Sequence, residues 1–165
     1  MHHTVVLGLS VMLAACATAR DIRMTNQQLT IAAKCRANDR CLFEGNDLFL
    51  DISISNNENI EIGFPLAYVQ KTGPIVRLID TRTKTETHLK RNLADLDLRE
   101  KFTMIPPGRS IALEWVITSD ELQQFGGRFV DVSAEITLMA TIQVSGQRVE
   151  FRGTDTLHIV SKDKP

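Results

Sequence analysis

Residues 130–144 read VDVSAEITLMATIQV, and this stretch decides the fold class. Apolar side chains occupy every second position, and the positions between them are mostly polar. The apolar set is Val130, Val132, Ala134, Ile136, Leu138, Ala140, Ile142 and Val144, and the polar set includes Asp131, Ser133, Glu135, Thr137, Thr141 and Gln143. Because successive side chains of a strand point to opposite faces, this period of two predicts a long strand with one buried face. The solvated second face favours an antiparallel sheet.

The same alternation recurs on both sides of this strand. Ser145 and Gly146 form a turn signal, after which we expect two shorter strands. The further expected strands cover 48–55, 60–64, 75–79, 86–90 and 111–117 upstream, and 149–153 and 156–160 downstream. Roughly seven short strands with polar turns favour an antiparallel, immunoglobulin-like β-sandwich. A β-barrel is the alternative all-β architecture.

One short connecting helix is expected at 119–125. Thr118 and Glu121 have the spacing of a capping box, and a pair of glycines at 126 and 127 follows as a stop signal. The segment 92–101 has no clean period, so we expect a charged loop that can hold one helical turn capped by Asn92. Trp115 lies in the middle of an alternating strand and is expected to be a core aromatic residue.

The N-terminal segment has the composition of an export signal. Residues 5–15 carry no charge and end at Cys16, and they are too few for a transmembrane helix, which needs about 20 apolar residues. The alternative is a buried element of the domain with Cys16 as an ordinary thiol. The run Leu13, Ala14, Ala15 and Cys16 resembles the lipobox of bacterial lipoproteins. This resemblance implies cleavage by signal peptidase II and lipidation of Cys16.

The lipobox resemblance divides the chain into a signal peptide at 1–15, a lipidated tether at 16–26 and a β-sandwich domain at 27–165. It also implies acylation, with palmitate as an expected group, and membrane attachment through the N-terminal lipid. Ala17 and Thr18 follow the cysteine, and neither is the Asp that resembles an inner-membrane retention signal. We therefore expect a lipoprotein of the outer membrane that faces the periplasm.

The charge of the chain restricts its partners. The formal net charge is -1 at pH 7, whereas nucleic-acid binders concentrate positive charge. We therefore expect no nucleic-acid partner, and membrane attachment through the lipid rather than through a basic patch.

Cys35 and Cys41 are separated by only five residues, 36–40. In an oxidising periplasm such a pair predicts a disulfide that closes a small loop. Free thiols and a metal site are the alternatives. A metal site would need further ligands, and His88 and His158 lie far along the sequence. We expect neither a metal nor a cofactor.

The sequence contains no catalytic motif that we can identify. It lacks a Gly-x-Ser-x-Gly elbow, a His-Glu-x-x-His motif, a P-loop and a dinucleotide fingerprint. Asp95, Asp97 and Glu100 could hold calcium or act as paired carboxylates, but basic residues at 91, 99 and 101 surround them. We expect a solvated charged loop there and a protein that is not an enzyme.

Binding by exposed loops is the remaining possibility, because loops presented by a rigid scaffold often carry function. The candidates are the loop closed by the two cysteines and the charged loop at 91–101. The candidate partner-binding residues are Arg36, Asn38, Asp39, Arg40, Asp95, Asp97 and Arg99.

Residues 95–110 read DLDLREKFTMIPPGRS and resemble a stretch of the TssJ-type lipoproteins of type VI secretion. That family is a lipidated β-sandwich whose loop contacts an inner-membrane partner, although no contact residue transfers to this chain. The resemblance implies a non-catalytic protein-binding module of a secretion apparatus, with an envelope protein as partner. A periplasmic inhibitor or immunity protein that inserts the small disulfide loop into a hydrolase is an alternative, because a constrained loop loses little entropy on binding. A cell-wall hydrolase or other enzyme is a third hypothesis.

Overall fold

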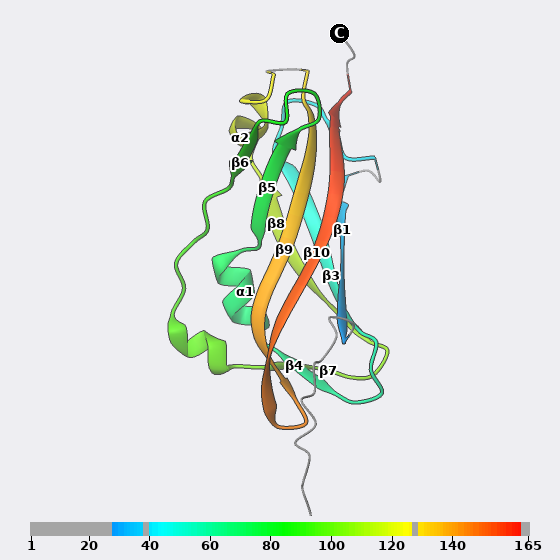
Figure 1. Cartoon of the computed structure of the whole chain (residues 1–165), viewed down its shortest axis with the longest axis vertical. Helices are drawn as coiled ribbons and strands as arrows, with labels where there is room; N and C mark the ends of the chain where they lie inside the picture. The colour runs from blue at the N-terminus through cyan, green and yellow to red at the C-terminus, as the bar shows by residue number, and fades with distance from the viewer. Residues whose placement is uncertain (1–27, 38–39, 127–128, 163–165) are drawn as a thin grey trace, which may run out of the picture.

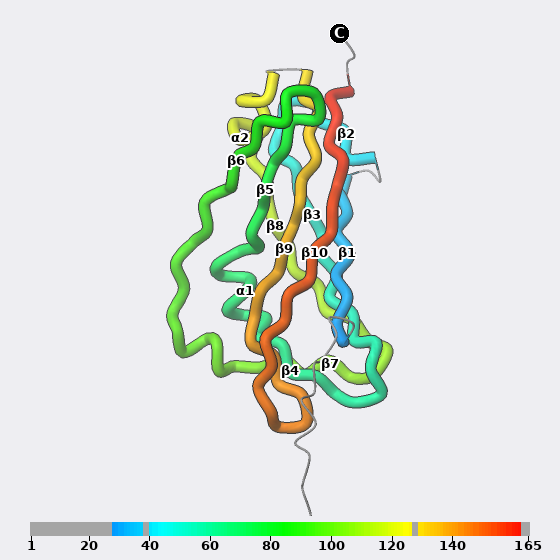
Figure 2. Tube along the Cα trace, in the orientation of Figure 1, coloured from blue at the N-terminus to red at the C-terminus, as the bar shows by residue number. Residues whose placement is uncertain are grey.

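The computed structural model describes residues 28–37, 40–126 and 129–162. Its strands form two sheets that pack around one core (Figures 1 and 2). The first sheet has the order β1-β3-β8, and the second has the order β2-β10-β9-β4-β7, with β5 paired to β9 and β6 to β5. The strands are β1 (Leu29–Cys35), β2 (Leu42–Phe43), β3 (Leu48–Asn56), β4 (Ile62–Phe64), β5 (Ile75–Asp80), β6 (Glu86–His88), β7 (Thr103–Ile105), β8 (Ser110–Ile117), β9 (Asp131–Val144) and β10 (Gln147–Ser161). The expected all-β sandwich is confirmed.

Strand β9 forms the centre of the second sheet. It is 14 residues long and pairs with β10 along its whole length. Its alternate apolar side chains, Val132 to Val144, are buried in the core as the sequence predicts. Positive φ angles at Ser145 (49°) and Gly146 (78°) give the turn between the two strands the conformation of a type I′ hairpin.

Three helical segments connect the strands, namely α1 (Leu66–Thr72), the 3-10 helix η1 (Leu96–Glu100) and α2 (Ser119–Gln123). The last of these is the expected connecting helix. Its capping box is present, since the Thr118 hydroxyl accepts the Glu121 N–H and the Glu121 carboxylate accepts the Thr118 N–H at 2.9 Å. The helix ends at Gln123, two residues before its predicted end. In the described part of the chain, none of the helices is long and apolar enough to cross a membrane.

The prediction of two separate strands at 149–153 and 156–160 is wrong, because β10 is continuous from Gln147 to Ser161. Gly153 does not turn the chain. A Cβ atom at this position would lie 2.7 Å from Cζ of Phe151 and 3.0 Å from Cγ2 of Ile31. The glycine therefore allows a close approach between β10 and β1 rather than a break in the strand.

Strand β1 is not among the strands that the sequence pattern predicts, although it pairs with β3 over its full length. The edge of β1 that does not pair with β3 faces β10, and Asp155 lies on the inner face of β10. The Asp155 carboxylate accepts the backbone N–H of Ala33 at 2.7 Å. This hydrogen bond satisfies a donor on the β1 edge and closes one side of the sandwich.

Helix α1 is also absent from the sequence-based expectation, and it closes the opposite side. Gly73, which ends the helix, has φ 77° and ψ 166°, and its N–H donates to the Val69 carbonyl at 2.8 Å. Trp115 of β8 packs against the core, as expected, directly beneath this glycine. A Cβ atom on Gly73 would overlap the indole ring. The position therefore needs glycine for both its backbone conformation and its packing.

We predict that Gly73→Ala lowers the free energy of unfolding by about 3 kcal/mol or more, because backbone strain and overpacking act together. Gly108→Ala is the matched control. Gly108 also has a positive φ, 66°, but no atom lies within 4 Å of the position that a Cβ would occupy, so we expect a loss of about 1 kcal/mol. Urea unfolding monitored by tryptophan fluorescence measures both values. Equal losses in the two variants would contradict the packing role of Trp115.

Candidate binding surface

The two loops selected from the sequence lie on different sides of the sandwich (Figures 1 and 2). The loop closed by the cysteines follows β1 and lies beside β10, where the Val160 N–H donates to the Cys41 carbonyl. The other loop belongs to a long connection beyond α1. We call this connection, residues 89–102 between β6 and β7, the strap. The sequence candidates therefore form two separate surfaces rather than one site.

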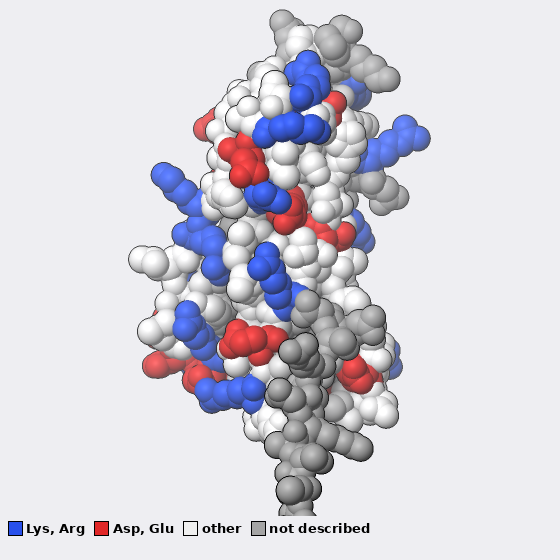
Figure 3. Space-filling view, in the orientation of Figure 1, with Lys and Arg blue, Asp and Glu red and all other residues white. Residues whose placement is uncertain are grey.

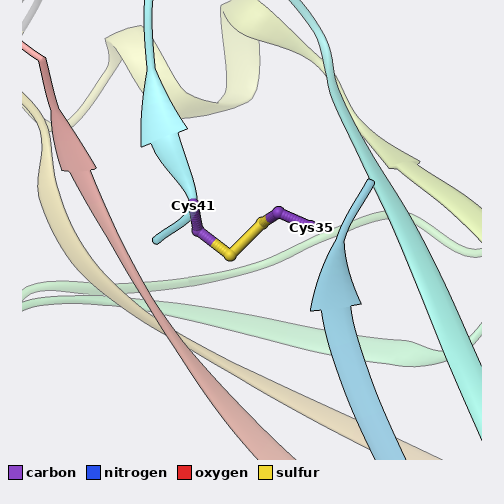
Figure 4. Close-up of a disulfide and its surroundings, with 2 residues drawn as sticks. All are labelled: Cys35 and Cys41. Atoms are coloured by element: carbon purple, nitrogen blue, oxygen red, sulfur yellow. A yellow bond between two sulfur atoms is a disulfide. The ribbon is translucent and has the colours of Figure 1, made fainter. Parts of the chain in front are cut away.

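The expected disulfide is present between Cys35 and Cys41 (Figure 4). The two Cα atoms are 5.2 Å apart, and each cysteine is only 3% exposed within the core cluster. The covalent bond therefore fixes the far end of the loop, at Cys41, to the end of β1. Of the remaining loop candidates, Arg40 is exposed, whereas Asn38 and Asp39 lie outside the described residues.

Arg36, the first residue of this loop, is occupied by interactions within the domain. Its guanidinium lies 2.8 Å from an Asp51 carboxylate oxygen and 2.7 Å from a Glu114 oxygen. It also lies 5.9 Å from the centroid of the Phe49 ring. The hydrogen bonds that Arg36 donates, first to Asp51 and second to Glu114, raise the pKa of Arg36 above its ordinary value. A partner would have to compete with both carboxylates for this cation.

The strap is held against the body of the domain by main-chain hydrogen bonds. The Leu89 N–H donates to the Val76 carbonyl at 2.9 Å, and the Asn92 N–H donates to the Thr72 carbonyl at 3.1 Å. The Arg91 guanidinium adds a side-chain bond of 3.2 Å to the Thr72 hydroxyl. The first part of the strap is therefore anchored to β5 and to the end of α1.

The helical turn expected in this segment is η1, but its cap is not Asn92. The N-cap residue is Asp95, whose carboxylate accepts the Asp97 N–H at 3.0 Å. Asn92 does not take that role because η1 begins only at Leu96, beyond the reach of the Asn92 side chain along the sequence. Asp95 and Asp97 are exposed, and among the described residues no group of three or more His, Cys, Asp or Glu could hold a metal ion.

The second part of the strap is fastened by two side-chain contacts. The Arg99 guanidinium lies 4.9 Å from the centroid of the Tyr68 ring and donates to the Tyr68 hydroxyl at 2.8 Å. Glu100 forms an ion pair with Arg148 of β10, with a bond of 2.9 Å from Nη1. Tyr68 lies one turn before Thr72 on α1, so a single face of this helix contacts both strap arginines.

A cavity of about 370 Å³ lies between the strap, α1 and the strands β9 and β10. Its lining residues are Pro65, Tyr68, Arg91, Arg99, Glu100, Phe102, Met139, Ala140, Thr141, Arg148 and Glu150. Among the described residues, the middle of β9 has no strand neighbour on this side, because β5 pairs with one end of β9 and β4 with the other, and the cavity lies there. Gly63 of β4 leaves room for Phe102, since a Cβ there would lie 3.0 Å from Phe102 Cβ.

Sequence reasoning selects Arg99 but misses the residues that complete the cavity. Tyr68 and Arg148 carry no signal in the sequence, since only the fold brings α1 and β10 next to the strap. Met139 does carry one, because it is an apolar residue on the otherwise polar face of β9 and is 46% exposed. A single exposed apolar side chain is common on protein surfaces, however, and only a contiguous apolar patch marks a contact site, so the fold is needed to place Met139 in the cavity.

The remaining outer face of the second sheet carries charges that neutralise one another. Figure 3 shows basic and acidic side chains next to one another over this face. Arg77 lies 3.0 Å from Glu86, and its hydrogen bond to Glu135 is the main cause that raises its pKa. His158 lies 2.8 Å from Asp131, and this hydrogen bond lowers the pKa of Asp131. His158 therefore has a structural contact, and His88 is exposed on β6.

No protein-family model matches the chain, and no curated protein matches it. Among solved structures, a target of the Northeast Structural Genomics Consortium is similar to it at 8% identity and a TM-score of 0.46, over 84% of this chain and 90% of that chain. A protein from Archaeoglobus fulgidus is similar at 8% identity and a TM-score of 0.37, over 82% of this chain and 98% of that chain.

We predict that Cys35→Ala combined with Cys41→Ala lowers the free energy of unfolding by roughly 2 kcal/mol, since the disulfide closes a short loop in the unfolded chain. Urea unfolding measures the change. Reducing the wild-type protein with dithiothreitol is the control, and it should produce a similar loss without any substitution. Identical urea midpoints for oxidised and reduced wild-type protein would contradict a stabilising role.

Proposed function

We propose that this chain is an outer-membrane lipoprotein whose β-sandwich binds another envelope protein in the periplasm, as a non-catalytic component of a secretion apparatus. The observation that carries the proposal is the exposure of two leucines on the anchored strap. Leu93 is 96% exposed and Leu96 is 63% exposed. Burying a leucine side chain is worth about 1.5–3 kcal/mol. A partner that covers the strap would therefore gain binding energy from both.

The anchoring of the strap supports the same proposal. A flexible loop loses conformational entropy when a partner orders it, and this loss weakens binding. Main-chain hydrogen bonds at Leu89 and Asn92 and the contacts of Arg99 and Glu100 already fix the strap in the free domain. The two leucines are thus presented on a segment that is ordered before binding.

The alternative function, a periplasmic inhibitor or immunity protein, would use the loop between Cys35 and Cys41. The disulfide favours that role because it constrains the loop. Arg36 argues against it, because Asp51 and Glu114 already bind its guanidinium. The strap leucines are exposed, so a partner could contact them without displacing an interaction within the domain. We therefore favour the strap as the contact surface.

The lipid anchor is supported by the lipobox at 13–16 alone, which lies outside the described residues. We predict that Cys16→Ser abolishes incorporation of labelled palmitate and leaves the precursor uncleaved, because the thioether bond requires the thiol. Labelling followed by electrophoresis of the membrane fraction measures both effects. Cys35→Ala combined with Cys41→Ala is the control and should be labelled normally. Labelling that survives Cys16→Ser would contradict the anchor.

For the binding surface, we predict that Leu93→Ala combined with Leu96→Ala reduces capture of the envelope partner by about tenfold or more, because truncated interface anchors lose this much affinity. The full chain serves as bait in detergent-solubilised bacterial envelopes, and quantitative mass spectrometry compares the variants. Ile60→Ala is the matched control, since Ile60 is also exposed, at 38%, in a different loop.

The same capture experiment separates the two functions. If the strap variant no longer captures the partner and the Cys35→Ala and Cys41→Ala bait still does, the result supports the binding module. If only the cysteine variant fails to capture the partner, the result supports the inhibitor instead. Undiminished capture by both variants would contradict each of these surfaces.

A further inference from the structure

We infer that the strap cavity recognises an acidic side chain of the partner protein, next to an apolar side chain that contacts the strap leucines. This inference rests on the proposed protein-binding function and specifies the chemistry of its partner. The evidence is the combination of two arginines without carboxylate partners, an exposed apolar wall and a volume suited to one or two side chains.

Some charged side chains of the cavity have a partner of opposite charge and others do not. Glu100 and Arg148 form an ion pair with each other. Glu150, on the opposite wall, accepts a hydrogen bond from the Thr141 hydroxyl at 2.8 Å. Within residues 28–37, 40–126 and 129–162, no carboxylate lies within salt-bridge distance of Arg91 or Arg99. The Thr141 hydroxyl is neutral, so Glu150 also has no cation partner among the described residues. The lining holds three arginines and two glutamates, and the excess positive charge is therefore on the wall formed by the strap and α1.

The two arginines are held in place while retaining unused donors. Arg99 stacks on Tyr68 and uses one N–H on the Tyr68 hydroxyl, and Arg91 uses one N–H on the Thr72 hydroxyl. A guanidinium has further N–H groups in a planar fork, which matches the two oxygens of a carboxylate. Because stacking on an aromatic ring leaves the edge of the guanidinium accessible, Arg99 can still bind a carboxylate in this way.

The apolar part of the surface determines what accompanies the carboxylate. Tyr68, Phe102 and Met139 line the cavity, and Leu93 and Leu96 are exposed on the strap, which forms one wall of the cavity. A volume of about 370 Å³ is at the lower end of the roughly 300–1,000 Å³ of ligand pockets. The cavity thus takes one or two side chains, and the leucines contact the polypeptide that carries them.

Selection of peptides tests the inference without knowledge of the partner. Random peptides displayed on phage are selected on the full chain in detergent and counter-selected on the Arg91→Gln and Arg99→Gln double variant. We expect an enriched pattern of Asp or Glu beside a large aliphatic or aromatic residue. Calorimetry with the synthetic peptide should then show binding that is about tenfold to a hundredfold weaker with either single variant, since charged hydrogen bonds are lost.

Two controls separate recognition from folding. Arg109→Gln removes an exposed arginine from the turn before β8, outside the cavity, and should leave the affinity unchanged. Replacing the acidic residue of the peptide by its amide leaves the protein intact and should cause the same loss as Arg99→Gln. Combining that peptide with Arg99→Gln should add little, as expected for two groups that contact each other. Raising the salt concentration from about 0.1 M to about 1 M should also weaken binding.

The outcomes distinguish this inference from the function on which it rests. Selected peptides could bind less tightly to the Leu93→Ala and Leu96→Ala variant and yet contain no acidic residue, or bind equally well when Arg91 and Arg99 are replaced. Either result would overturn the inference and leave the protein-binding proposal intact. The inference would also be overturned if hexanoate bound as tightly as the peptide. Self-association of the chain would overturn it too, if Arg99→Gln abolished that self-association. Capture of the envelope partner that is insensitive to the strap leucines would overturn both.

Discussion

Strand β9 pairs with β10 along one edge, and on its other edge it is longer than either of its neighbours, β5 and β4. This difference in length determines the structure on one side of the molecule. Along its first edge, β10 pairs with all 14 residues. Along its second edge, β5 pairs with residues 132–137 and β4 with residues 143–144, so within the described residues the middle of β9 has no strand partner there. The chain between β4 and β5 forms α1 beside this gap. The cavity lies between α1, the strap and the uncovered part of β9.

Helix α1 then links the core to the candidate binding surface. Its C-terminal end packs Gly73 onto Trp115 in the core, while the face that carries Tyr68 and Thr72 contacts Arg99 and Arg91 of the strap. The position of the strap thus depends on the same helix that closes the sandwich. A segment fixed to the core in this way keeps its geometry through these contacts alone.

The two candidate loops show why exposure alone does not identify a binding surface. Both contain exposed arginines in a charged stretch of sequence. Arg36 is neutralised by Asp51 and Glu114, whereas Arg99 is supported by an aromatic ring and carries no compensating carboxylate among the described residues. Since a free cation can still gain an ionic partner, Arg99 retains binding capacity that Arg36 has already used within the domain.

The sequence by itself determined the sandwich class, strand β9, the capping box of α2 and the pairing of Cys35 with Cys41, because each depends on periodicity or spacing over a few residues. Only the tertiary structure decided that β10 is continuous through Gly153, that β1 is a strand and that 66–72 form a helix. Only the fold could likewise place Tyr68, Met139 and Arg148 around the strap, since these residues come from α1 and from the β9–β10 hairpin, which are both distant in sequence from the strap. Contacts of this kind depend on which strand edges remain uncovered, and local sequence patterns do not encode that.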